Sequence, residues 1–256
     1  MPVRVLSVAT NIINVGAQNL IKSAMLHGEN VEFIGLGETW GGWVWRMKKY
    51  KEAIALIKDD DIVVCIDAYD VLITNSLQLI HDLFKNPETK IIVSSDSWCF
   101  GRNCKYITTF HEKRKRKLKS KSGNLYVCMG VIAGRPRDLE KMYQEILDSG
   151  IQDDQVGLAT FMENHAGDPG IELDDDEILA CNVTGLKHFD LSFENSAMFT
   201  HFPSFVTWTG FSLNYRNQLK KHTTNGKQYV LLGKYRKTCQ YIGLFILILI
   251  VLKFFM

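Results

Sequence analysis

The sequence predicts an open α/β fold with a mostly parallel central sheet, and three features of the chain predict it. Residues 3–36 read as a strand, a helix and a second strand, the order of a right-handed βαβ unit. The apolar run from Ile62 to Ile66 has the length and β-branched content of a strand buried on both faces. Further apolar segments then alternate with helical ones. Because 256 residues suffice for one large α/β domain, we expect a single domain over residues 1–222.

The first strand, residues 3–8, ends at Val8 and is followed by a turn that contains Thr10. Small and hydroxyl residues after a first strand are typical of a turn that meets a nucleotide. Helical spacing over residues 17–26 and a strand over residues 31–36 complete the first βαβ unit.

An aromatic loop precedes the next helix, which we expect over residues 44–58. Trp40 belongs to this loop, and its ring could stack on a nucleobase, while Arg46 on the helix could meet a phosphate. The alternative is that these side chains only pack the helix onto the sheet or form its solvated face.

Two carboxylates three positions apart, Asp67 and Asp70, stand directly after the central strand in the sequence DAYD. Ligands of open α/β sheets bind at the carboxyl ends of strands, because helices cover both faces. Carboxylates there are hard ligands suited to Mn²⁺ or Mg²⁺, which also bind substrate phosphates. The motif therefore predicts a metal site that holds a nucleotide diphosphate, although such aspartates can also serve as turn or capping residues.

The remaining elements follow from the same patterns. We expect helices over residues 77–84, 137–147 and 156–163, and strands over residues 90–95, 125–133, 178–183 and 196–201. The strand over residues 90–95 is followed by Asp96, and the last strand ends in His201. A histidine beside an aspartate pair that needs a third ligand becomes a metal-ligand candidate.

Two further acidic groups lie later in the chain. Asp153 and Asp154 open the helix over residues 156–163, where they either cap the helix or face a sugar or an acceptor hydroxyl. The four adjacent acids of residues 174–177 cannot all point one way, and we expect them in an exposed turn rather than in a metal cluster.

Charge and hydropathy describe the rest of the chain. The net charge of +2 argues against a general nucleic-acid role. The amino terminus lacks the pattern of a secretory signal, which predicts a cytosolic domain. Residues 113–121 form a strongly basic segment that could bind anionic lipid, recognise an acidic acceptor, act as a nuclear-import signal, or be a solvated loop with no specific role. Residues 241–256 are almost wholly apolar and follow a basic linker, residues 223–240, so we expect a hydrophobic C-terminal helix that anchors the chain in a membrane.

These motifs together resemble the glycosyltransferase domain of the procollagen lysyl hydroxylases and the related procollagen galactosyltransferases. The resemblance covers about residues 4–215, and it depends on a set of segments in a fixed order that closes with Leu213-Asn214-Tyr215. The other segments are VAT at 8–10, GLGETWGG at 35–42, DAYDV at 67–71, SSDSWC at 94–99 and DDQ at 153–155, and the late strand ends in His201.

The resemblance implies a GT-A fold and Mn²⁺-dependent transfer, with Mg²⁺ as the alternative ion, of glucose or galactose from UDP-glucose or UDP-galactose to a hydroxyl of a protein or glycan acceptor. The implied metal ligands are Asp67, Asp70 and His201. Residues lining the nucleotide or donor would be Val8, Thr10, Trp40, Arg46 and Tyr69. Those facing the sugar and acceptor would be Asp96, Asp153 and Asp154, with Asp154 the first choice for a general base.

The sequence departs from the family at two places, both near the diphosphate or sugar. Cys128-Met129 replaces an Asn-Ser pair, and Phe202-Pro203 follows His201 where the family has Gly-Asn. A catalytically inactive scaffold of a membrane or virion is therefore the rival interpretation. A nucleotidyltransferase is a second rival, although the first strand lacks a glycine-rich phosphate loop. A cytosolic enzyme of this family also suggests a viral protein that acts in host cytoplasm.

Overall fold

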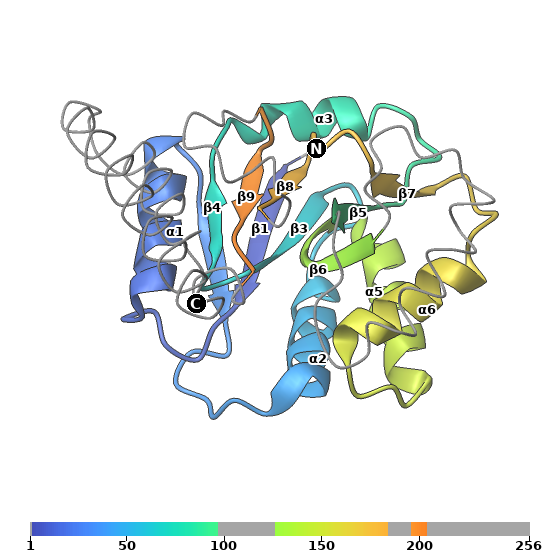
Figure 1. The fold of residues 1–256 in the computed structure, drawn as a ribbon, viewed down its shortest axis with the longest axis horizontal. Helices are drawn as coiled ribbons and strands as arrows, with labels where there is room; N and C mark the ends of the chain where they lie inside the picture. Colours follow the sequence, from blue (N-terminus) through green and yellow to red (C-terminus); the bar gives the residue numbers. More distant parts are fainter. Residues whose placement is uncertain (1, 97–125, 184–195, 204–256) are drawn as a thin grey trace, which may run out of the picture. The chain divides into compact units, whose positions relative to one another are not determined.

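Six strands form the central sheet, in the order β2-β1-β3-β6-β5-β7, and all except β6 run in the same direction (Figure 1). The computed structural model describes residues 2–96, 126–183 and 196–203. The strands are β1 (Val3–Val8), β2 (Val31–Ile34), β3 (Ile62–Asp67), β5 (Ile91–Asp96), β6 (Tyr126–Gly134) and β7 (Ile171–Asp174). The predicted mixed α/β fold with a mostly parallel central sheet is confirmed.

The register of the sheet brings the ends of β1 and β3 together. Val8 of β1 is the direct neighbour of Asp67, the last residue of β3. Because β5 and β7 run in the same direction as β1 and β3, Asp96 at the end of β5 lies on the same edge of the sheet. This carboxyl edge is where open α/β sheets bind ligands.

Both faces of the sheet are covered, which explains why β3 is apolar along its whole length. Side chains of successive residues point to opposite faces, so Val63 and Cys65 join one core while Ile62, Val64 and Ile66 join the other. The first core lies under α2 (Gly42–Ile54), α5 (Pro136–Asp148) and α6 (Asp154–Asn164). The second lies under α1 (Val15–Leu26), α3 (Ile80–Leu83) and a second sheet.

The second sheet has three short strands in the order β4-β9-β8 (Figure 1). They are β4 (Val71–Ile73), β8 (Ala180–Asn182) and β9 (Phe199–His201). β4 pairs with β9 in antiparallel orientation, and Val71 is the neighbour of His201. β8 pairs with β9 in parallel orientation, and Asn182 is the other neighbour of His201. This sheet therefore places His201 beside the DAYD segment, although the two are far apart in the sequence.

Most predicted elements are present, but several differ from the prediction. The strand expected over residues 196–201 is reduced to β9. The expected helix over residues 77–84 is a 3₁₀ turn, η1 (Leu77–Leu79), followed by the single turn α3. The strand expected over residues 178–183 is reduced to β8. Neither β4 nor β7 was predicted, because three or four residues are too few to show a strand period.

Asp174 corrects the prediction that residues 174–177 form an exposed turn. Its side chain is buried and accepts hydrogen bonds from the backbone N–H groups of Ile178 and Ala180, both at 2.9 Å. Asp174 therefore closes the loop between β7 and β8. Burial raises the pKa of this carboxyl to about 6, although the backbone N–H donors lower it.

This raised pKa predicts a pH-dependent stability. In the unfolded chain an aspartate titrates near ~3.9, so folding favours the protonated form and its stabilising effect is lost as the pH rises through about 6. The wild-type protein should lose on the order of 2–3 kcal/mol of unfolding free energy from this group between pH 4 and pH 7. Asp174→Asn should remove that contribution in denaturant unfolding across this range, whereas Asp176→Asn, at an exposed position, should leave it. Parallel pH profiles for wild type and Asp174→Asn would contradict the assignment.

Several predicted segments lie outside the described residues. The chain divides into two units, Met1–Thr223 and Thr224–Met256, and every described residue belongs to the first. The basic segment 113–121, the linker 223–240 and the apolar segment 241–256 are not among the described residues. Within the described part of the chain, no helix combines the length and apolar composition that crossing a membrane requires.

Candidate metal and nucleotide site

The imidazole of His201 and the carboxylates of Asp67 and Asp70 converge on one point. His201 Nε2 lies 3.6 Å from Asp67 Oδ2 and 3.7 Å from Asp70 Oδ1. One ligand atom from each of the three side chains lies within 4.8 Å of the other two. Such spacing allows all three atoms to bind a single cation between them. The arrangement supports the three metal ligands that the sequence comparison implied.

Backbone pairing explains how distant residues reach this point. Asp67 is the last residue of β3, and Asp70 follows in the turn that leads into β4. His201 ends β9 opposite Val71, and the next residue, Phe202, donates its backbone N–H to Asp70 O at 2.7 Å. The pairing of the short strand β4 with β9 thus brings His201 to the two aspartates, and the sequence pattern alone did not reveal this pairing.

His201 is buried, and three residues that sequence reasoning had not assigned to the metal site surround its ring. Its Nδ1 lies 2.6 Å from Asn182 Oδ1 and 3.4 Å from Cys128 Sγ. A Cβ atom at Gly130 would stand 2.2 Å from His201 Cε1, so only glycine leaves room for the imidazole. The Cys128 departure, which was expected near the diphosphate or sugar, is therefore in direct contact with a metal-ligand candidate.

Burial and mutual charge set the protonation of this cluster. Burial raises the pKa of Asp70, although His201 partly opposes the shift. Burial alone would lower the pKa of His201, but its interactions with Cys128 and Asp70 outweigh that effect and raise it. A proton on His201 therefore offsets the buried negative charge in the metal-free protein, and a bound cation would take over that function.

Arg46 bridges Asp67 to a second buried carboxylate. Its Nη1 pairs with Asp67 Oδ1, and its Nη2 lies 2.7 Å from Asp154 Oδ2. Burial opposes the charge of Arg46, but Asp67 and Asp154 outweigh it and raise the pKa of the guanidinium. Asp67 thus uses one oxygen for Arg46 and presents the other toward His201.

The side chains around the site carry a net negative charge that a divalent cation would balance. The carboxylates of Asp67, Asp70 and Asp154 are countered by the guanidinium of Arg46, while His201 can be neutral. The difference is two negative charges at a partly buried site, where unpaired charge is costly. A divalent cation would balance them.

Two of the residues expected to line the nucleotide, Val8 and Tyr69, lie beside the metal-ligand candidates. Val8 is the strand neighbour of Asp67, and Tyr69 Oη accepts from the backbone N–H of Asn11 at 3.4 Å. Thr10 O accepts from Gly37 N at 3.0 Å, which ties the turn after β1 to the loop that contains Trp40. Trp40 is 47% exposed and packs edge-on against Trp43. An aromatic side chain is therefore exposed on the β2–α2 loop.

The three residues expected near the sugar and acceptor have different environments. Asp153 caps α6, accepting from Val156 N at 3.0 Å, which agrees with the simpler capping interpretation. Asp154, the next residue, is buried and paired with Arg46. Burial raises the pKa of Asp154, and Arg46 opposes that shift. Asp96 is buried at the carboxyl end of β5.

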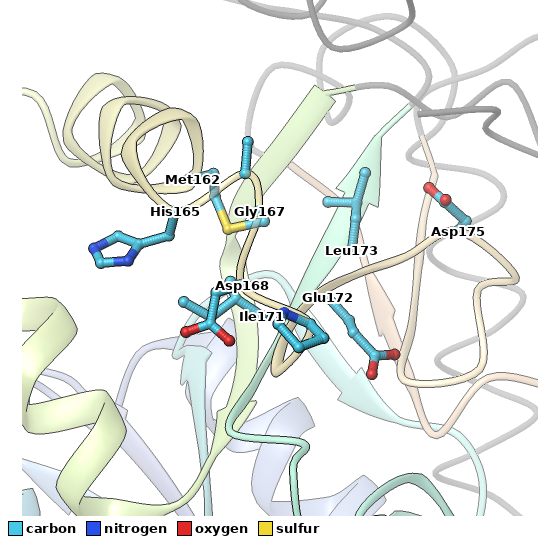
Figure 2. Close-up of a pocket in the computed structure, with 10 residues that line it drawn as sticks. Met162, His165, Gly167, Asp168, Ile171, Glu172, Leu173 and Asp175 are labelled. Carbon is cyan, nitrogen blue, oxygen red and sulfur yellow. The ribbon is translucent and has the colours of Figure 1, made fainter. Parts of the chain in front are cut away.

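A separate cavity of about 390 Å³ lies between the end of α6 and β7 (Figure 2). Its lining includes His165, Asp168 and Glu172, and none of the three metal-ligand candidates. Asp168 is held by Lys90 Nζ at 2.8 Å, and His165 pairs with Glu145 at the same distance. These groups stabilise the α6–β7 connection, and the cavity is distinct from the metal-ligand cluster.

Comparisons with known proteins agree with this geometry. The family model of the PLOD GT domain matches residues 2–225. Procollagen-lysine,2-oxoglutarate 5-dioxygenase of Drosophila melanogaster is 33% identical over 107 residues, which is 38% of this chain and 15% of that protein. This chain therefore corresponds to a small part of the fly protein.

The fold is also similar to a solved glycosyltransferase involved in the glycosylation of the major capsid of PBCV-1. The TM-score is 0.53 at 12% sequence identity, and the match covers 85% of this chain and 98% of that one. At this identity the likeness concerns the fold alone.

Proposed function

Since this chain belongs to the PLOD GT domain family, we propose that it transfers glucose or galactose from a UDP-sugar to a hydroxyl acceptor with the help of Mn²⁺. The single observation that carries the proposal is the convergence of Asp67, Asp70 and His201. Two carboxylates suit Mn²⁺ and Mg²⁺ alike, whereas an imidazole nitrogen suits transition metals, so the donor set favours Mn²⁺.

The three ligands would hold the cation at the place where a diphosphate arrives. When bound, a divalent cation stabilises the negative charge that develops on UDP as it leaves. Tyr69 and Trp40 would offer exposed aromatic surface to the uridine, and Val8, the strand neighbour of Asp67, and Thr10, in the turn after β1, would complete its lining. Arg46 holds Asp67 by the oxygen that faces away from His201.

The transfer forms a bond between the acceptor oxygen and the anomeric carbon, and breaks the bond from that carbon to the diphosphate. The acceptor proton passes to a base. Asp154 is the first candidate by sequence, and burial raises its pKa and so favours proton acceptance, although its pairing with Arg46 opposes that shift. We retain Asp154, Asp153 and Asp96 as the residues that face the sugar and acceptor.

We also propose that residues 241–256 tether the chain to a membrane, with the catalytic domain on the cytosolic side. We further propose that it is a viral protein that acts in host cytoplasm. The support is the apolar composition of that segment and the preceding Lys234, Arg236 and Lys237. The acceptor is a hydroxyl of a protein, such as a hydroxylysine of a collagen-like chain, or of a glycan.

The proposal is tested by incubating the full chain, in detergent, with Mn²⁺ and a panel of UDP-sugars and measuring the release of UDP. We expect release from UDP-glucose or UDP-galactose that stops when the metal is chelated. A scaffold with no catalytic role should release no UDP and should show no Mn²⁺-dependent rise in melting temperature with UDP. That pair of negative results would refute the proposed function.

A further inference from the structure

Asn182 makes hydrogen bonds whose direction can be read from its partners. Its Nδ2 lies 2.7 Å from the backbone carbonyl of Ser95, and its Oδ1 lies 2.6 Å from His201 Nδ1. A backbone carbonyl can only accept, so the amide nitrogen of Asn182 must face Ser95. The amide oxygen must then face His201, and it accepts a hydrogen from Nδ1.

We propose that Asn182 is a positioning residue that keeps the proton of a neutral His201 on Nδ1, so that the lone pair of Nε2 faces the cation. The inference rests on the proposed function, since it gives Asn182 a purpose in metal binding. Nε2 is the ring nitrogen that lies near Asp67 and Asp70. Outer partners of this kind fix both the orientation and the tautomer of a metal-binding histidine.

The surroundings of Asn182 hold its side-chain amide in one orientation. Asn182 is the β8 neighbour of His201 and is only 2% exposed, so water does not compete for its amide. Ser95 belongs to β5, which means that the carbonyl holding Asn182 is part of the central sheet. The central sheet therefore fixes the amide of Asn182 through Ser95, and Asn182 in turn fixes the imidazole of His201.

Cys128 provides the competing arrangement. Its thiol also lies beside His201 Nδ1, and it is buried and free of any disulfide. If Asn182 lost its acceptor, the thiol could donate to a bare Nδ1, and the ring proton would move to Nε2. Nε2 would then point an N–H at the carboxylates and could not bind a metal without losing that proton.

The first test compares the Mn²⁺ affinity of two variants of the full chain by calorimetric titration. Asn182→Leu removes the acceptor and should weaken Mn²⁺ binding by about 10–100-fold, the usual effect of losing an outer partner. Asn182→Asp keeps an oxygen acceptor toward Nδ1, although it gives up the amide donor to Ser95 O, so it should bind Mn²⁺ more tightly than Asn182→Leu. Equal losses in both variants, or an unchanged affinity in Asn182→Leu, would overturn the proposal.

Thr74→Val is the matched control for a purely structural effect. Thr74 Oγ1 makes two buried hydrogen bonds beside the same small sheet, to Ala197 O and to Thr200 Oγ1, both at 3.0 Å. Its replacement should lower the melting temperature as Asn182→Leu does, but should leave Mn²⁺ affinity unchanged.

A second measurement reads the tautomer without any metal. Nitrogen chemical shifts of the His201 ring, recorded by NMR at alkaline pH where the imidazole is neutral, should show a protonated Nδ1 in the wild type and a mixture in Asn182→Leu. A proton on Nε2 in the wild type would overturn the inference even if Mn²⁺ binds. Conversely, a wild-type chain that binds no Mn²⁺ would refute the proposed function, while the NMR result still decides the tautomer.

Discussion

Replacing Asp70 with asparagine is expected to abolish Mn²⁺-dependent release of UDP while the fold stays intact. Asparagine has the same shape but lacks the charge that attracts a cation to this buried place. Metal stabilisation of a leaving group contributes several kcal/mol, which corresponds to a loss of about 10³-fold or more in turnover. Burial already raises the pKa of Asp70, so removing the carboxylate relieves an unfavourable charge in the metal-free protein. Steady-state UDP release and far-UV circular dichroism measure the two effects.

Asp82→Asn is the control for this substitution. Asp82 is an exposed acid on α3 that pairs only with Lys85 three residues later among the described contacts, at 2.6 Å. Its replacement should leave turnover at the wild-type level. If Asp70→Asn released UDP at a comparable rate, Asp70 could not be a metal ligand.

Arg46→Met is expected to destabilise the fold strongly, because it leaves Asp67 and Asp154 without their shared counter-charge. Breaking a buried ion pair by removing one partner typically costs about 3–5 kcal/mol. Asp154 is only 6% exposed, so its carboxylate cannot turn to water without local rearrangement. Urea unfolding should show a fall in unfolding free energy of this size, and turnover should fall as well because Asp67 loses its orientation.

Two comparisons decide whether the charge bridge is the cause. Lys49→Met, on the same helix, breaks a more exposed pair with Glu38 and should change the unfolding free energy by no more than about 1 kcal/mol. The double variant Arg46→Met with Asp154→Leu removes one of the orphaned charges and should regain part of the lost stability. A loss for Arg46→Met no larger than that for Lys49→Met would contradict the account.

The sequence was sufficient to predict the parts of the site that follow from local pattern. Asp67 follows a strand whose β-branched run is hard to mistake, and its position at the carboxyl edge follows from the α/β architecture. The third ligand, His201, was one candidate at the end of a predicted strand, and the resemblance then implied it as a ligand, because its separation from Asp70 along the chain leaves no local signal.

The parts that could not be predicted depend on short strands and on contacts across the fold. β4 has three residues and was not predicted, because pairing with β9 rather than intrinsic pattern makes it a strand. Asn182 looks like an ordinary polar residue in the sequence, and only its contact with His201 reveals its place at the site. Arg46 was expected to meet a phosphate. Its burial against Asp67 and Asp154 could not be predicted from the sequence of its own helix, because the two partners lie on other elements.

The most direct measurement of the central claim is the position of the ion itself. A crystal of the chain grown with Mn²⁺ and UDP, measured at the manganese absorption edge, gives an anomalous peak wherever the ion binds. We predict one strong peak within about 2.0–2.6 Å of carboxylate oxygens of Asp67 and Asp70 and of His201 Nε2. A peak that lacks His201 as a ligand, or that lies away from both aspartates, would contradict the account.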